Sequence, residues 1–138
     1  MPQNITVGAK SLVEAAEREI ENLAVEDAIK LHGRDDVVLV DIRDPRELQR
    51  DGKVPGAFHC PRGMLEFWID PASPYHKPRF AEDKRFVFFC AGGLRSALAA
   101  QAAQHMGLKP VAHIRGGFGA WKNAGGPVEA PEPPNPKT

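Results

Sequence analysis

An apolar strand that leads directly into a cysteine loop and then a helix is the feature that most constrains this chain. Residues 86–89 are Phe-Val-Phe-Phe, a run typical of a parallel strand covered on both faces. Cys90 follows at once, and residues 96–106 form an alanine-rich helical pattern closed by Gly107. In open α/β sheets, ligands bind beyond the carboxyl ends of the strands. The sequence therefore predicts a thiol held at the binding edge of such a sheet.

The residues between this strand and helix are suited to stabilising a thiolate. Gly92 and Gly93 carry no side chains and can take positive φ, so the loop can curl with its N–H groups pointing inward. The N-terminus of the following helix adds a partial positive charge, and Arg95 adds a permanent cation with a planar fork of donors. We therefore interpret Cys90 as an activated nucleophile rather than as a buried structural cysteine.

The segment Cys-Ala-Gly-Gly-Leu-Arg-Ser at residues 90–96 resembles the active-site loop of the rhodanese-like sulfurtransferases. Three other segments resemble that family in the same order along the chain: 37–43, which ends in Asp-x-Arg, 52–57, and the closing stretch 116–128. The second of these carries Lys53 where the family usually has histidine, a departure that lies outside the cysteine loop. The resemblance covers roughly residues 23–128.

This resemblance implies an α/β fold: a single rhodanese-like domain with a mainly parallel, roughly five-stranded sheet and helices on both faces. It implies that Cys90 and Arg95 are catalytic and that the other loop residues bind the substrate: Ala91, Gly92, Gly93, Leu94 and Ser96. Asp41 and Arg43 are expected to support the site by pairing at the end of their strand, and with Glu47 or the cysteine loop. No metal ion or organic cofactor is expected.

The implied reaction moves a sulfane sulfur through a persulfide on Cys90. The donor would be thiosulfate, polysulfide or another persulfide, and the acceptor cyanide or a thiol. One alternative is a sulfur-relay module that delivers this sulfur to a partner protein, with an acidic N-terminal helix as the docking face. Another is a cysteine-dependent phosphatase or arsenate reductase. The related phosphatases have one more residue between cysteine and arginine, so the four residues between Cys90 and Arg95 favour sulfur.

Composition excludes several other classes of function. Eighteen basic and eighteen acidic residues leave no net charge to attract nucleic acid or an anionic membrane. No apolar run approaches the length of a membrane span, and residues 1–6 lack the pattern of a secretory signal. Two cysteines in 138 residues do not make a disulfide framework, so we expect a cytoplasmic protein. The sequence does not indicate an oligomeric state.

We divide the chain into an N-terminal helical extension at 1–22, the rhodanese-like domain at 23–128 and a proline-rich flexible tail at 129–138. In the extension, the pattern predicts a helix over 11–23 that is capped by Ser11, with an apolar face formed by Leu12, Ala16, Ile20 and Leu23. The domain is expected to contain strands at 37–42, 57–60, 86–89 and 111–114. An irregular loop near the site is expected over 70–80.

Three further residues can be interpreted in two ways. Cys60 ends a short strand without a glycine-rich loop, which favours packing over a role as a resolving thiol. His59 and His113 lie beside apolar strands, and neither has a second ligand at metal spacing. We therefore expect both histidines to be satisfied by hydrogen bonds rather than to bind a metal.

Overall fold

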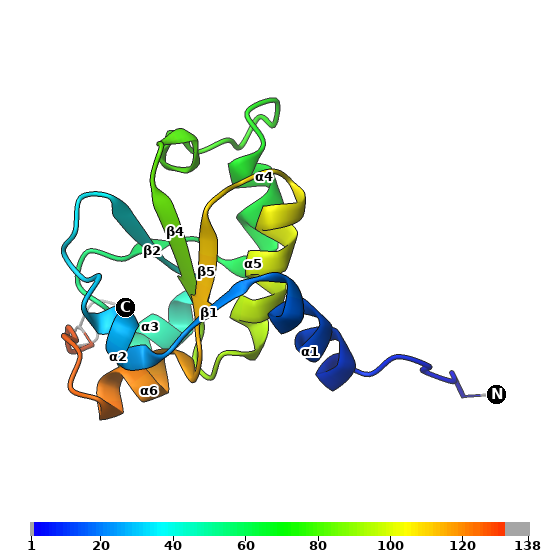
Figure 1. The fold of residues 1–138 in the computed structure, drawn as a ribbon, viewed down its shortest axis with the longest axis horizontal. Coiled ribbons are helices and arrows are strands. Elements are labelled where there is room, and N and C mark those ends of the chain that lie inside the picture. Colours follow the sequence, from blue (N-terminus) through cyan, green and yellow to red (C-terminus); the bar gives the residue numbers. More distant parts are fainter. Residues whose placement is uncertain (1, 132–138) are drawn as a thin grey trace, which may run out of the picture.

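The computed structural model describes residues 2–131 and has a five-stranded parallel sheet in the order β1-β5-β4-β2-β3 (Figure 1). The strands are β1 (Glu21–Leu23), β2 (Val37–Asp41), β3 (Phe58–His59), β4 (Arg85–Phe89) and β5 (Val111–Ile114). The predicted α/β fold class is confirmed. β4 lies at the centre and is buried after its first residue, as its apolar run predicts.

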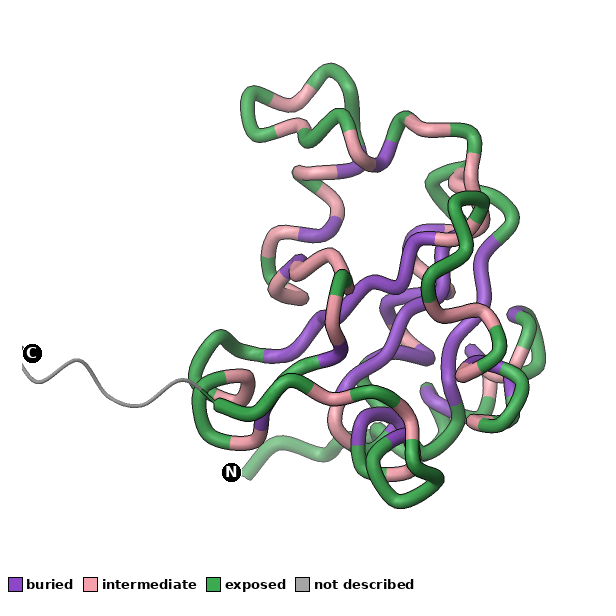
Figure 2. Tube along the Cα trace, turned by 90° about the vertical axis from the view of Figure 1, so that its left-hand side faces the viewer, coloured by how far each residue is buried: buried purple, intermediate pink, exposed green. Residues whose placement is uncertain are grey.

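Helices cover both faces of the sheet and form two apolar layers. The helices are α1 (Ala9–Glu19), α2 (Val25–Ile29), α3 (Pro45–Asp51), α4 (Leu65–Ile69), α5 (Leu94–His105) and α6 (Gly117–Asn123). Because successive strand residues point to opposite faces, Phe86 and Phe88 pack in the layer with α1, α4 and α5. Val87 and Phe89 pack in the layer with α2 and α6. Figure 2 shows the buried strands between the more exposed helices and loops.

The N-terminal helix differs from the prediction at both ends. α1 begins at Ala9 with Gly8 as its N-cap, so the predicted cap at Ser11 is wrong. The helix ends before Ile20, whose backbone is already extended, and the chain continues into β1. Residues 21–23 pair with β5 at the edge of the sheet. This pairing ends the helix four residues earlier than its sequence pattern suggests.

The buried face of α1 also differs from the predicted one. Leu12 is 49% exposed, whereas Val13 and Ala16 are buried in the layer with α5. Ile20 and Leu23 are buried as expected, but they lie beyond the helix. The face is therefore set by contact with α5 and not by the apolar pattern over 11–23. Before α1, the chain extends away from the domain (Figure 1).

The segment 70–80 does not lie near the cysteine loop, so that prediction is wrong. This segment leads into the first residue of β4, whereas Cys90 follows its last residue. A five-residue strand separates the two by roughly 16 Å at about 3.3 Å per residue, which places them at opposite ends of the sheet.

The start of the predicted tail is attached to the domain. Glu129 and Lys53 form an isolated antiparallel bridge, with hydrogen bonds of 3.0 and 2.7 Å between their main chains. The Trp121 indole also donates to the Pro127 carbonyl at 2.8 Å. The prediction of a flexible tail mostly concerns residues 132–138, which lie outside the described residues.

Candidate active site

Cys90 lies immediately beyond β4, at the carboxyl edge of the central strand. The residue is only 1% exposed. Its Sγ accepts a hydrogen bond from the Gly93 N–H at 3.1 Å. Gly93 is the N-cap of α5, with a φ of 96° that favours glycine, whereas Gly92 has no positive φ. The loop therefore directs a backbone donor and the end of a twelve-residue helix towards the sulfur.

The carbonyls of the cysteine loop point towards α6. The Phe118 N–H donates to the Cys90 carbonyl at 2.8 Å, and the Gly119 N–H donates to the Ala91 carbonyl at 3.1 Å. In a trans peptide, the C=O and the following N–H point in opposite directions. The amides of Ala91 and Gly92 therefore face away from α6.

Close packing between the loop and α6 depends on Gly117. A Cβ atom at this position would lie 2.3 Å from the Cys90 carbonyl oxygen and 2.8 Å from that of Ala91. Its φ of 60° is also in the left-handed region. A larger residue would push α6 away from the carbonyls whose orientation it holds. The glycine pair in the predicted closing segment thus shapes the cysteine loop.

Arg95 is held by an acidic residue from a distant part of the chain. Its two terminal nitrogens donate to the Glu47 carboxylate at 2.7 and 3.0 Å. The hydrogen bonds from Arg95 hold the pKa of Glu47 below its usual value. They also raise the pKa of Arg95, to which Cys90 adds a smaller effect of the same sign. Arg95 has five N–H groups, so three are left after this pair is formed.

Glu47 is itself oriented by the start of α3. Asp44 accepts a hydrogen bond from the Arg46 N–H at 2.8 Å, and Glu47 accepts one from the Asp44 N–H at 3.2 Å. Pro45 occupies the first helical position, where its missing N–H costs no hydrogen bond. This capping box presents the Glu47 carboxylate to Arg95.

Asp41 and Arg43 form a buried clasp at the end of β2. The Arg43 guanidinium donates to both Asp41 oxygens, with a shortest distance of 2.7 Å, and to the Gly52 carbonyl at 3.0 Å. Its Cζ lies 4.2 Å from the centre of the Phe118 ring. The predicted pairing between these two residues is present, but Glu47 pairs with Arg95 instead. Phe118, whose N–H donates to the Cys90 carbonyl, connects the clasp to the cysteine loop.

Ser96 and Leu94 occupy contrasting positions on α5. Ser96 is fully buried, with its Oγ 3.6 Å from the Cys90 sulfur and 3.0 Å from the Nδ1 of His113. Leu94 is 66% exposed and faces solvent. The contact between Ser96 and His113 was not predicted from the sequence. The sequence does hold a signal for this contact, because His113 is the one polar residue in the apolar run 111–114. A polar side chain buried in such a strand needs a hydrogen-bond partner.

Cys60 has the properties of a packed thiol. It is completely buried in the layer with α5, and burial raises the pKa of its thiol to about 12. A thiol with a raised pKa stays protonated until the pH approaches that value, so at neutral pH it supplies almost no thiolate. This favours the packing interpretation over a resolving thiol.

His59 donates a hydrogen bond to the main chain. Its Nε2 lies 2.7 Å from the Arg43 carbonyl. Within residues 2–131, no group of three or more His, Cys, Asp or Glu side chains is arranged to hold a metal ion. In the same part of the chain, no helix has both the length and the apolar character required to cross a bilayer.

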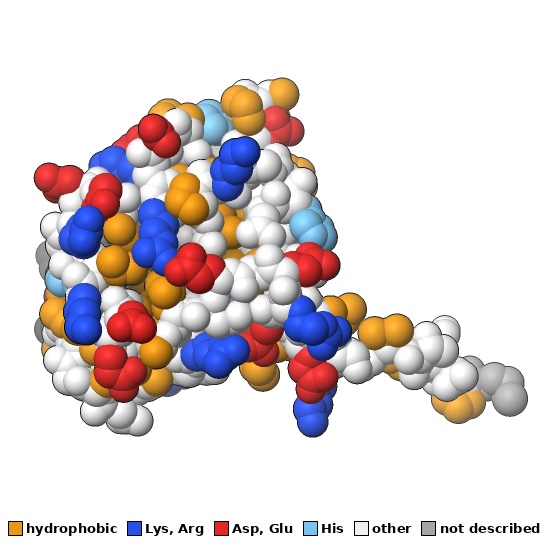
Figure 3. Space-filling model, in the orientation of Figure 1, with side chains coloured by type: hydrophobic (Ala, Val, Ile, Leu, Met, Phe, Trp, Pro, Cys, Tyr) orange, Lys and Arg blue, Asp and Glu red, His pale blue; other side chains and the backbone are white. Residues whose placement is uncertain are grey.

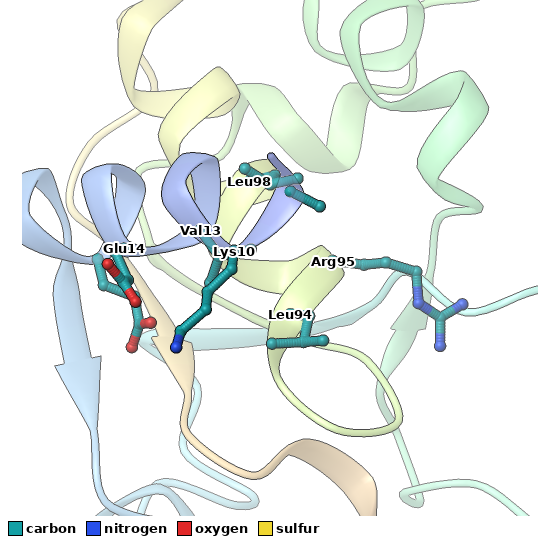
Figure 4. A pocket seen from close by; sticks show the side chains of 8 residues that line it. Lys10, Val13, Glu14, Leu94, Arg95 and Leu98 are labelled. Atoms are coloured by element: carbon teal, nitrogen blue, oxygen red, sulfur yellow. The ribbon is translucent and has the colours of Figure 1, made fainter. Parts of the chain in front are cut away.

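A cavity of about 470 Å³ borders the first turn of α5 on the side of α1. Figure 4 shows Leu94 and Leu98 from α5 near Lys10, Val13 and Glu14 from α1, with Arg95 pointing away from them. The molecular face in Figure 3 carries Lys and Arg side chains interspersed with Asp and Glu. The cavity next to the cysteine loop therefore has an apolar lining that also includes the charged residues Lys10, Glu14, Glu17 and Arg95.

Together, the parallel sheet and the cysteine beyond its central strand define an α/β protein with a buried thiol that accepts a backbone hydrogen bond at the carboxyl edge of the sheet. The model of the rhodanese-like domain family matches residues 24–124, and the chain belongs to this family. The resemblance carried by the four sequence segments is confirmed by this match, and the family relationship supports sulfurtransferase activity.

Several proteins of known sequence or structure are similar to this chain. A sulfurtransferase from Allochromatium vinosum is 33% identical over 75% of this chain and 88% of its own. The structure of the polysulfide-sulfur transferase homodimer from Wolinella succinogenes has a TM-score of 0.67 and 32% identity, over 88% of this chain and 86% of that one. The structure of a protein of unknown function from Rhodopseudomonas palustris, described as a possible tyrosine phosphatase, has a TM-score of 0.91 and 69% identity. The match covers 94% of this chain and 99% of that one.

Proposed function

We propose that this protein transfers sulfane sulfur from thiosulfate, polysulfide or another persulfide to a thiophilic acceptor, with Cys90 as the sulfur carrier. The observation that carries the proposal is the Cys90 sulfur at the end of β4, 3.1 Å from the Gly93 amide at the start of α5. A sulfur atom placed there is stabilised as an anion, both as thiolate and as persulfide. The sulfurtransferases among its relatives support the same reaction class.

The reaction has two half-reactions with a covalent intermediate. In the first, the Cys90 thiolate attacks the outer sulfur of the donor, and the donor's S–S bond breaks. With thiosulfate, sulfite leaves with the bonding electron pair and Cys90 carries a persulfide. In the second, cyanide or a thiolate attacks the outer sulfur and the Cys90 thiolate is regenerated. A reducing compartment such as the cytoplasm suits this chemistry, because a reactive thiol is restored there after oxidation.

Mass spectrometry after separate exposure to thiosulfate and polysulfide tests the proposal. We expect a gain of one sulfur atom on the peptide that contains Cys90, and loss of that sulfur when cyanide is added. A parallel assay with a generic aryl phosphate addresses the phosphatase alternative, which the description of the Rhodopseudomonas palustris protein brings forward. Steady hydrolysis of the phosphate without any sulfur adduct would contradict the proposal.

A second candidate function is sulfur relay to a partner protein. The apolar cavity between α1 and α5 supports it, because the cavity borders Leu94 and Arg95 of the cysteine loop. An acceptor protein seated there would bring its thiol to the side of the loop. The six acidic residues between Glu14 and Asp27 would then favour a basic partner surface.

The relay is tested by comparing sulfur transfer from the loaded protein to a purified protein acceptor and to cyanide. For a relay module, we expect the protein acceptor to react faster. We also expect Lys10→Glu, at the cavity, to change transfer to the protein several-fold and leave transfer to cyanide unchanged. Lys30→Glu, next to α2 on the other face of the sheet, is the matched control. Equal effects of both variants would argue against docking at this cavity.

A further inference from the structure

A chain of hydrogen bonds runs from Cys90 across the sheet to its edge strand. The Cys90 Sγ lies 3.6 Å from the Ser96 Oγ, and the Ser96 Oγ lies 3.0 Å from the His113 Nδ1. The His113 Nε2 lies 2.8 Å from the Asn22 Oδ1. Ser96 is 0% and His113 1% exposed, so water does not compete for the two bonds of the Ser96 hydroxyl, whereas the bond between His113 and Asn22 is partly buried. The chain connects the nucleophile to a titratable group that sulfur transfer, as described above, does not use.

The direction of each hydrogen bond follows from Asn22. Its Nδ2 donates to the carbonyls of Glu17 at 2.8 Å and Ile20 at 3.1 Å, which orients the amide. The Oδ1 is therefore the acceptor towards His113, and the His113 Nε2 carries a proton. In a neutral imidazole, Nδ1 is then an acceptor, so the Ser96 hydroxyl donates to it. A lone pair of Ser96 remains to accept from the Cys90 thiol.

The protonation state of the His113 ring depends on its burial and on the charges around it. Burial lowers the pKa of His113, and Arg115 lowers it further, whereas Glu17 raises it. The Glu17 carboxylate lies 4.0 Å from the His113 Nε2 and 3.7 Å from the Arg115 Nε. A lowered pKa means that the His113 ring is neutral at neutral pH. His113 is then ready to accept a proton, with Glu17 placed to offset the charge that results.

We propose that His113 receives, through Ser96, the proton that Cys90 gives up when its thiolate forms. The Cys90 S–H bond breaks and its proton moves to the Ser96 Oγ, while the Ser96 proton moves to the His113 Nδ1. The products are a thiolate, an intact hydroxyl and an imidazolium, and no electrons are exchanged. Ser96 then donates to the thiolate and accepts from His113. His113 is a positioning residue in this scheme, because it acts on Cys90 only through Ser96. The scheme rests on the proposed function of Cys90 as the nucleophile.

This arrangement couples the titration of Cys90 to that of His113. A proton on His113 frees the Ser96 hydroxyl to donate to the thiolate, so each charged group stabilises the other. Two groups coupled in this way titrate together, so each apparent pKa describes the pair and not a single residue. The thiolate should therefore form at lower pH with His113 present, and His113 should keep its proton to higher pH with Cys90 present.

Two spectroscopic titrations test the coupling in a Cys60→Ala background, in which Cys90 is the sole cysteine. The ultraviolet absorbance of the thiolate follows Cys90, and ¹⁵N NMR of the imidazole follows His113. We expect His113→Asn to move thiolate formation to higher pH by about one unit or more, and Ser96→Ala to do the same. We expect Cys90→Ala to move the His113 titration to lower pH. His105→Asn, an exposed histidine on the same helix as Ser96, should change neither titration.

The outcome that overturns the proposal is a His113 titration that does not move when Cys90 is replaced by alanine. Ser96 and His113 would then form a structural hydrogen-bond chain only. This measurement does not depend on His113→Asn folding well, because the histidine is retained. Neither titration uses a sulfur donor, so the two proposals can fail separately. If the titrations are coupled but exposure to thiosulfate and polysulfide leaves no sulfur on Cys90 in the mass-spectrometry experiment, the proposed function is contradicted and the proton transfer stands.

Discussion

Replacing Cys90 with serine should leave a folded protein that forms no persulfide. A serine hydroxyl is a far weaker nucleophile than a thiolate and cannot carry a sulfane sulfur. Serine also has nearly the shape of cysteine, and its Oγ can accept from the Gly93 N–H that now contacts the sulfur at 3.1 Å. The sulfur adduct is measured by mass spectrometry after exposure to thiosulfate or polysulfide, and folding by circular dichroism.

Cys60→Ala is the control for this experiment. The second thiol is fully buried, and its pKa is raised to about 12, so at neutral pH it is protonated and unreactive. We therefore expect the Cys60→Ala protein to gain sulfur at nearly the unmodified rate, with some loss of stability from the cavity in the core. An inactive Cys60→Ala protein beside an active Cys90→Ser protein would show that the carrier has been assigned to the wrong cysteine.

Replacing Arg95 with alanine should slow sulfur transfer by a factor on the order of 10²–10³, the usual effect of removing one charge-stabilising donor from such a site. Arg95→Lys should fall between alanine and the native residue, because it keeps the charge and loses the planar fork. The pair with Glu47 at 2.7 and 3.0 Å holds the guanidinium beside the loop and leaves other N–H groups for the donor or the outer sulfur. Single-turnover rates of persulfide formation and discharge measure the effect.

Alkylation of Cys90 separates this role from general thiol reactivity. The Gly93 amide and the end of α5 are still present in the Arg95 variants, so the alkylation rate should change much less than sulfur transfer does. Arg46→Ala is a suitable control, because this exposed arginine adjoins Glu47 and pairs only with Asp44 among the described residues. If Arg95→Ala transferred sulfur at nearly the native rate, Arg95 would be a structural link between α5 and α3.

The fold and the position of Cys90 could be predicted because their signals are local. The run 86–89 is apolar throughout because β4 is covered on both faces, and Cys90 follows it within one residue. The capping box from Asp44 to Glu47 is equally local, since its hydrogen bonds join residues at most three apart. The roles of the loop residues remain predictions that the experiments above address.

The edge strand and the helix before it could not be predicted in the same way. Residues 21–23 are Glu-Asn-Leu, which has no apolar run or strict alternation. They form a strand because β5 offers them an open edge, with Asn22 opposite His113. That pairing also ends α1 early and turns Val13 rather than Leu12 towards α5. Contact with distant elements outweighed a helical pattern that continues through these residues.

The sequence by itself thus determined a parallel α/β sheet and a thiol at the carboxyl edge of its central strand, because chain neighbours impose both. The tertiary structure alone decided which side chains surround that thiol. Glu47 meets Arg95 across 48 residues, Ser96 meets His113 across 17, and His113 meets Asn22 across 91. Residues so far apart carry no periodic signal of their contact. They meet because parallel strands place their carboxyl ends along one edge, where buried polar groups must find hydrogen-bond partners.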